Sequence, residues 1–225
     1  MHCGHPLSSL DLVPVFSFVF LGGKCRYCGA RISWQYPLVE VIAAALSALV
    51  YWQNPALVGF TVQPLPFIFW FVVWMTLLFV VIYDLKHTII PWSCSGLLVV
   101  LAVVSLFFNL QTLHFGVPGL WVLLAGPLLA LPLFLLSLFS GGTWMGWGDS
   151  ALETSLGWLV AASVGVSAGA TALCLAFWIG AVVGVVLLLL SRWGFFGYTI
   201  KSEIPFAPFL VLGALLAYFF LKIQL

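Results

Sequence analysis

Residues 65–83 read LPFIFWFVVWMTLLFVVIY, and the next residue is Asp84. The stretch has no charged side chain and is close to the roughly 20 apolar residues that cross a bilayer as a helix. Strands of a transmembrane barrel alternate apolar and polar residues over about ten positions, whereas this run is continuously apolar. It therefore predicts a membrane-spanning helix with an acidic residue at its end.

The rest of the chain repeats this pattern. Of the 225 residues 64% are hydrophobic, and only six are acidic and seven basic. Further apolar runs lie at about 37–52, 96–110, 118–139, 152–166, 168–191 and 205–221. We expect an all-α, polytopic bundle of about seven helices in a lipid bilayer, with a Cys-containing segment at 1–36 and a transmembrane domain at 37–225. The net charge of +1 and the lack of a basic run exclude nucleic-acid binding.

The basic residues predict the orientation. With seven helices, six of them fall on one side of the membrane: Lys24, Arg26, Arg31, Lys86, Arg192 and Lys201. The positive-inside rule makes that side, with the N-terminus, cytoplasmic. Two crossings, 96–110 and 118–139, separate Asp84 from Asp149, so both aspartates are expected at the cytoplasmic face.

Asp84 and Asp149 are the candidate catalytic residues. A carboxylate at a membrane edge is costly and is a functional candidate by default, although a single Asp often only caps a helix. Two facing carboxylates cannot both ionise cheaply, so one holds a proton while the other accepts one from water. This chemistry hydrolyses a peptide bond without a metal or a covalent intermediate. The serine-hydrolase and zincin motifs, Gly-x-Ser-x-Gly and His-Glu-x-x-His, do not occur.

Glycines precede the second aspartate, in Gly141-Gly142 and in Gly146-Trp147-Gly148-Asp149. They are expected to let the backbone take positive φ and to let another chain, such as a peptide substrate, approach closely.

Three cysteines in the N-terminal segment form a candidate metal site. Thiolates of Cys3, Cys25 and Cys28 suit a structural zinc knuckle, with His2 or His5 as a fourth ligand. Free thiols are the alternative.

Two further glutamates are singled out. Glu40 lies inside the first expected helix, where an ion pair with Arg31 or Lys86 and a role in substrate binding are equally plausible. Glu203 precedes Pro205, and a cap of the last helix is favoured there over a functional role.

Taken together, these motifs resemble those of the type IV prepilin peptidases. The resemblance covers nearly the whole chain and rests on the following segments: His5-Pro6-Leu7, Cys25-x-x-Cys28, residues 32–40, the Asp84 segment, Gly146-x-Gly148-Asp149 and residues 203–208. It implies a membrane aspartic endopeptidase with Asp84 and Asp149 as the catalytic pair. It also implies prepilin or pseudopilin substrates, the bacterial inner membrane, and S-adenosylmethionine for a second, N-methylating activity.

The sequence also departs from the family pattern. Ala151 stands where the family has Lys, Trp92 stands where it has Asp, and the chain opens at the second Cys of the family's first Cys pair, which is Cys3. We therefore expect a truncated or altered chain with weak proteolysis near neutral pH. The alternative class is a transporter or channel that uses the acids for protons or cations, but the sequence lacks the internal repeat typical of transporters.

Overall fold

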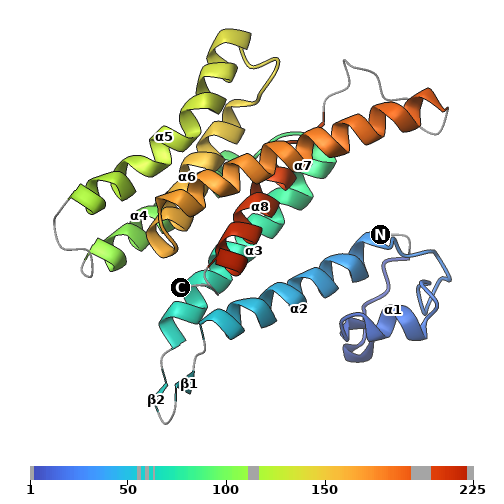
Figure 1. The fold of residues 1–225 in the computed structure, drawn as a ribbon. Helices are drawn as coiled ribbons and strands as arrows, with labels where there is room; N and C mark the ends of the chain where they lie inside the picture. Colours follow the sequence, from blue (N-terminus) through green and yellow to red (C-terminus); the bar gives the residue numbers. More distant parts are fainter. Residues whose placement is uncertain are drawn as a thin grey trace. The chain divides into compact units, whose positions relative to one another are not determined.

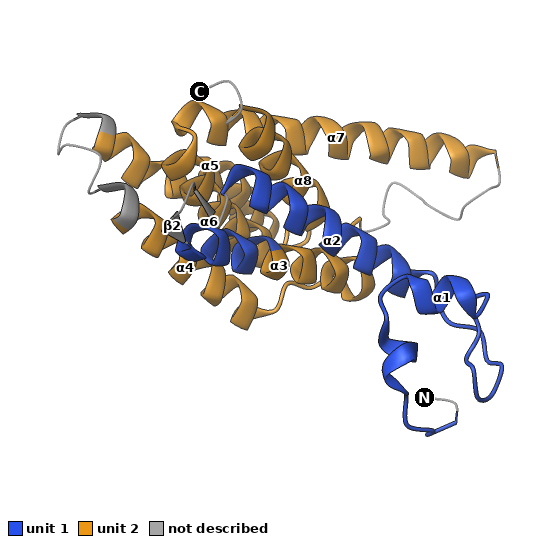
Figure 2. Cartoon of the chain, turned by 90° about the horizontal axis from the view of Figure 1, so that it is seen from below, with its two compact units in different colours: residues 1–74 blue, residues 75–225 orange. Residues whose placement is uncertain are grey.

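The computed structural model describes residues 3–54, 57–58, 61–62, 64–110, 117–193 and 204–221. The chain divides into two compact units, residues 1–74 and 75–225 (Figure 2). The boundary falls inside the long helix α3 (Pro64–His87).

Unit 1 begins with a 3-10 turn, η1 (Ser9–Leu12), and a one-turn helix, α1 (Phe16–Phe20). A loop that carries two of the cysteines leads to α2 (Gln35–Gln53). The two-residue strands β1 (Leu57–Val58) and β2 (Thr61–Val62) pair antiparallel before α3 begins.

A strained turn at Val15 connects η1 to α1. Val15 has φ 62° and ψ −48°, and the N–H of Phe16 donates to the carbonyl of Pro14 at 2.6 Å. This is a γ-turn of the rare positive-φ kind, which is unfavourable for a β-branched residue. The N–H of Val15 donates to the Glu40 carboxylate of α2 at 2.7 Å, so α2 holds the strained turn in place.

Unit 2 contains the end of α3 and then α4 (Trp92–Leu110), α5 (Val117–Ser140), α6 (Trp147–Ser163), α7 (Val166–Arg192) and α8 (Ala207–Leu216). The last helix continues as a π-helical turn, Ala217–Leu221. Helix α6 is central, since it packs against α4, α5, α7 and α8 (Figure 1). Most of its residues from Ser150 to Ala161 are buried.

The expected all-α bundle is confirmed. All seven predicted helices are present, and four of them, α2, α3, α5 and α7, are long and apolar enough to cross a membrane. The main difference lies in α6, which begins at Trp147 and not near 152. Asp149 therefore lies in the first turn of a helix and not in a loop before it.

Small residues and one tryptophan hold α5 against α6. A side chain at Gly126 would meet the ring of Trp158 at 2.7 Å, and one at Gly157 would meet the Cα of Gly126 at 3.1 Å. In an α-helix the N–H of residue 127 would donate to the carbonyl of Leu123, four residues earlier. Residue 127 is Pro127, which has no N–H, so that carbonyl lacks its usual helical donor. The indole N–H of Trp158 donates to the Leu123 carbonyl at 2.8 Å, so α6 satisfies an acceptor that the proline in α5 leaves open.

Candidate active site

Asp84 lies in the last turn of α3, and its side chain is only 4% exposed. Its Oδ2 accepts a hydrogen bond from the backbone N–H of Ala207, the first residue of α8, at 3.2 Å. The first N–H groups of a helix have no partner within the helix, and the positive end of the helix dipole favours an anion there. Asp84 thus caps a helix that is 123 residues away in the sequence.

Asp149 caps its own helix. Its Oδ2 accepts from the N–H of Gly146 at 3.1 Å, and its own N–H donates to the Gly146 carbonyl at 3.2 Å. The same carbonyl accepts from the hydroxyl of Ser137 at 3.3 Å, which joins the end of α5 to the start of α6.

The two aspartates lie in the same unit and close enough for the charge of Asp84 to act on Asp149. Each uses Oδ2 to cap a helix, whereas neither Oδ1 has a hydrogen bond to any residue that the structure describes. Each aspartate can therefore cap a helix through Oδ2 and still use Oδ1 in acid–base chemistry, so the two interpretations of these residues are compatible.

The two motif glycines have different roles from those expected. Gly146 has φ −69° and Gly148 is helical, so the expectation of positive φ is wrong for both. It holds for Gly141 and Gly142, with φ 61° and 85°. A side chain at Gly148 would meet the Cβ of Ile90 at 3.0 Å. The close approach at Gly148 is therefore made by the connection between α3 and α4, which brings the end of α3 to the start of α6.

The residue that departs from the family pattern, Ala151, lies two positions after Asp149 in α6. Side chains two apart in a helix do not face each other. A longer side chain at position 151, such as the lysine of the family pattern, would therefore leave α6 on a different face from the side chain of Asp149.

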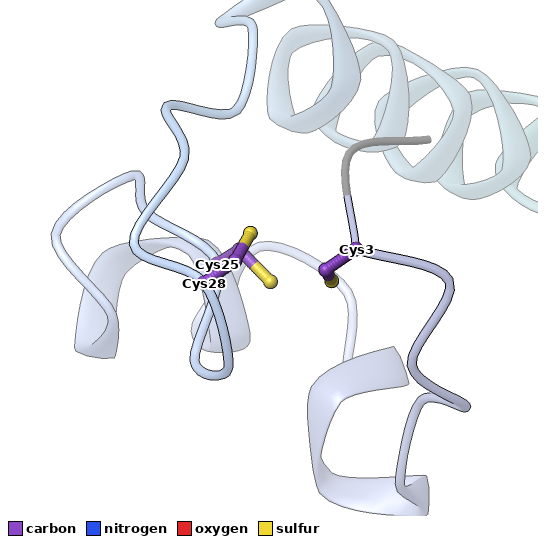
Figure 3. A group of neighbouring side chains, drawn as sticks. All are labelled: Cys3, Cys25 and Cys28. Atoms are coloured by element: carbon purple, nitrogen blue, oxygen red, sulfur yellow. The ribbon is translucent and has the colours of Figure 1, made fainter.

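The three cysteines of the N-terminal segment lie together (Figure 3), with their sulfur atoms all within 4.8 Å of one another. Cys25 and Cys28 belong to a tight loop closed by hydrogen bonds between Cys25 and Ala30 and between Gly29 and Cys25. Hydrogen bonds from the backbone of Cys28 and of Tyr27 lower the pKa of the Cys25 thiol below its ordinary value of 9.0. Three cysteine sulfur atoms at this separation are a donor set that fits a zinc ion.

Of the two histidines proposed as a fourth ligand, the described one, His5, is not part of the cysteine cluster. His5 stacks against Tyr27 with ring centroids 3.9 Å apart, and His2 lies outside the described residues.

Unit 1 also contains a cavity of about 280 Å³. Its lining includes Asp11, Tyr27 and Glu40. The Asp11 carboxylate pairs with Arg26 at 2.8 Å and accepts from the Tyr27 hydroxyl at 3.0 Å and from both the N–H and the hydroxyl of Ser8. These contacts, led by the Ser8 hydroxyl, hold the pKa of Asp11 below its ordinary value of 3.8.

The remaining predicted residues have mixed outcomes. Glu40 accepts a hydrogen bond from the Val15 N–H, and among the described residues of unit 1 the structure records no ion pair between Glu40 and Arg31. Glu203 lies outside the described residues. Two acids with a place in the structure were not predicted from the sequence: Asp11, which pairs with Arg26, and Glu153 in α6, which is 3% exposed. The signal for Glu153 was present in the sequence, since this residue lies four residues after Asp149 within an apolar run.

The fold and site define a polytopic membrane protein with one aspartate in the last turn of α3, another in the first turn of α6, and a three-cysteine cluster in its N-terminal unit. Residues 1–54 match the family model described as the bacterial peptidase A24 N-terminal domain. The chain is 30% identical to a prepilin leader peptidase/N-methyltransferase of Dichelobacter nodosus and 32% identical to one of Aeromonas hydrophila, covering 97% and 96% of this chain and 69% of each relative. A relative of the same name from Bacillus subtilis is 30% identical, over 97% of this chain and 79% of the relative. The chain belongs to the prepilin leader peptidase/N-methyltransferase family. No solved structure matches it.

Proposed function

We propose that this protein is a membrane aspartic endopeptidase that removes the leader peptides of prepilin or pseudopilin precursors. The observation that carries the proposal is the placement of Asp84 and Asp149 in one unit, where the connection after α3 contacts the start of α6 at Gly148 and each carboxyl keeps one oxygen outside its helix cap. Family membership supports the same assignment.

The reaction follows from the shared proton of the pair. Each carboxyl accepts a hydrogen bond from an N–H at the start of a helix, α8 for Asp84 and α6 for Asp149, which favours the ionised form, but mutual repulsion makes ionisation of both costly. The ionised carboxylate takes a proton from a water molecule as the water attacks the carbonyl carbon of the peptide bond. The protonated carboxyl donates to the carbonyl oxygen, and the proton taken from water passes to the peptide nitrogen as the C–N bond breaks. The proton on the former carbonyl oxygen returns to the other carboxyl, so the products are the leader's carboxyl group and a new amino terminus.

Gly146 and Gly148 act as positioning residues in this proposal. Gly148 lets Ile90 approach the start of α6, and the Gly146 N–H fixes one oxygen of Asp149. The distribution of basic residues supports a cytoplasmic site and a cytoplasmic N-terminus in the bacterial inner membrane.

Two further assignments belong to the proposal. Cys3, Cys25 and Cys28 would hold a structural zinc ion, which would stabilise the loop around residues 25–30. A second activity, N-methylation of the new amino terminus, would take its methyl group from S-adenosylmethionine.

Cleavage of a model prepilin by purified protein in detergent tests the main proposal. Asp84→Asn and Asp149→Asn should each abolish cleavage and keep the protein folded, since the remaining carboxyl cannot serve as both acid and base. Full cleavage by either variant would overturn the assignment. A transporter or channel would instead show no cleavage by the native protein, together with proton or cation flux in vesicles that the same substitutions stop.

A further inference from the structure

Glu153 is the one described acid in the core of unit 2 that the proposed mechanism does not use. Its side chain is 3% exposed, and no hydrogen bond or ion pair is recorded for its carboxyl among the described residues. An ionised carboxylate without a partner in such surroundings would cost several kcal/mol. The carboxyl is therefore expected in its neutral form, which has one O–H to donate.

The surroundings of α6 contain no obvious partner for a charge. The described residues of α4, α5, α8 and the turn 217–221 include no Asp, Glu, Lys or Arg, and α7 contributes only Arg192 in its last turn. The other titratable side chains of these elements are Cys94 on α4, Cys174 on α7 and Tyr218 on the terminal turn. From α3, the charge of Asp84 acts on Asp149.

The partner nearest in register is Asp149. Residues 149 and 153 are four apart in one helix, so their side chains emerge on the same face, one turn from each other. Leu156 and Val160 continue this face, and both are buried. The Gly146 N–H already occupies Oδ2 of Asp149, which leaves Oδ1 without a described hydrogen bond. One turn of helix thus carries an acceptor and a potential donor that are both unpartnered.

We propose that Glu153 is a positioning residue of the aspartate pair, a neutral acid whose O–H is directed to Oδ1 of Asp149 when Asp149 is ionised. The inference rests on the proposed function and deepens it. A hydrogen bond to the ionised form favours that form, so Glu153 would bias Asp149 toward acting as the base and Asp84 toward holding the shared proton. The proton remains on Glu153 through the cycle, and no other reactant is needed.

The test compares the pH profiles of prepilin cleavage for three variants. Glu153→Leu removes the donor and keeps an apolar side chain of similar size, so the acid limb of the profile should move to higher pH by roughly one unit. Glu153→Gln keeps an N–H donor and should leave that limb near its native position. Ser155→Ala is the matched control, because it removes another buried polar group of α6 on a different face, and its profile should not change. An unchanged acid limb in Glu153→Leu, or an equal shift in Ser155→Ala, would overturn the proposal.

An infrared measurement covers the case in which Glu153→Leu fails to fold. At neutral pH the native protein should show the C=O stretches of two protonated carboxylic acids, Glu153 and the member of the aspartate pair that holds the shared proton. Glu153→Gln should lose one of these bands and keep the other. The Glu153 band should survive in the double variant Asp84→Asn/Asp149→Asn, which removes the shared proton and whose cleavage decides the proposed function separately. If Glu153→Gln leaves the protonated-acid absorption unchanged, Glu153 is ionised and the inference fails, whatever the outcome for the aspartate pair.

Discussion

The carboxylate of Asp84, at the end of α3, accepts a hydrogen bond from the backbone N–H of Ala207, at the start of α8, at 3.2 Å. One contact therefore joins the proposed chemistry to the packing of the bundle. A substitution at Asp84 affects a helix cap as well as an acid, and the two effects need different variants to separate them.

Asp84→Ala should lose about 1–2 kcal/mol of stability, because it removes the acceptor of a buried helix N–H. Asp84→Asn keeps a carbonyl oxygen and should lose less than half as much, while losing cleavage as fully as Asp84→Ala. Thermal unfolding in detergent measures the difference, with the exposed neighbour Leu85→Ala as the control. Equal stability of the Ala and Asn variants would mean that the cap contributes nothing.

Gly148→Ala should destabilise unit 2 by about 1–3 kcal/mol, since the new methyl group would lie 3.0 Å from the Cβ of Ile90. The matched control is Gly96→Ala in α4, where the added carbon meets no atom within 4 Å. There the higher helix propensity of Ala should stabilise the protein by up to roughly 1 kcal/mol. We therefore expect Gly148→Ala to lower the free energy of unfolding and Gly96→Ala to raise it. If both substitutions change it in the same direction, Ile90 does not approach Gly148 closely.

Trp158→Phe should cost about 1–3 kcal/mol, because it leaves the Leu123 carbonyl without its indole donor. Trp178→Phe makes the same chemical change at a side chain of α7 that is 73% exposed, and it should change stability little. Unfolding of the two variants in parallel checks the prediction. A cost no larger at Trp158 than at Trp178 would show that the Leu123 carbonyl has another partner.

The purified protein should contain about one zinc ion per chain if the cysteine cluster binds metal. Cys25→Ser should lower the metal content and speed hydrogen exchange of the backbone amides at residues 24–31. Cys174→Ser, on α7 and outside the cluster, should do neither. Metal analysis that finds no zinc in the native protein would leave these cysteines as free thiols.

The helices could be predicted from the sequence because continuous apolar runs leave few alternatives in a membrane. Their ends could not, since α6 begins at polar and glycine residues whose hydrogen bonds, Gly146 to Asp149, lie outside the apolar run. The contact between Asp84 and Ala207 spans 123 residues, and one sequence holds no signal for it. The γ-turn at Val15 goes against the preference of a β-branched residue, so it depends on the distant Glu40.

The last prediction concerns pH and unit 1. Asp11 has a pKa below its ordinary value of 3.8 in the folded protein, chiefly because the Ser8 hydroxyl donates to its carboxylate. A lowered folded-state pKa means that the ionised carboxylate stabilises the fold above that ordinary value, and that this stabilisation is lost as the pH falls through the folded-state pKa. Hydrogen exchange of the amides in residues 8–12, corrected for its intrinsic pH dependence, should therefore be slow at pH 6 and faster near pH 3. Asp11→Asn should exchange quickly at both pH values, because a neutral amide oxygen accepts more weakly from Ser8 than a carboxylate does and cannot form the charged pair with Arg26. If Asp11→Asn keeps the native contrast between pH 6 and pH 3, another group controls the loosening of this segment.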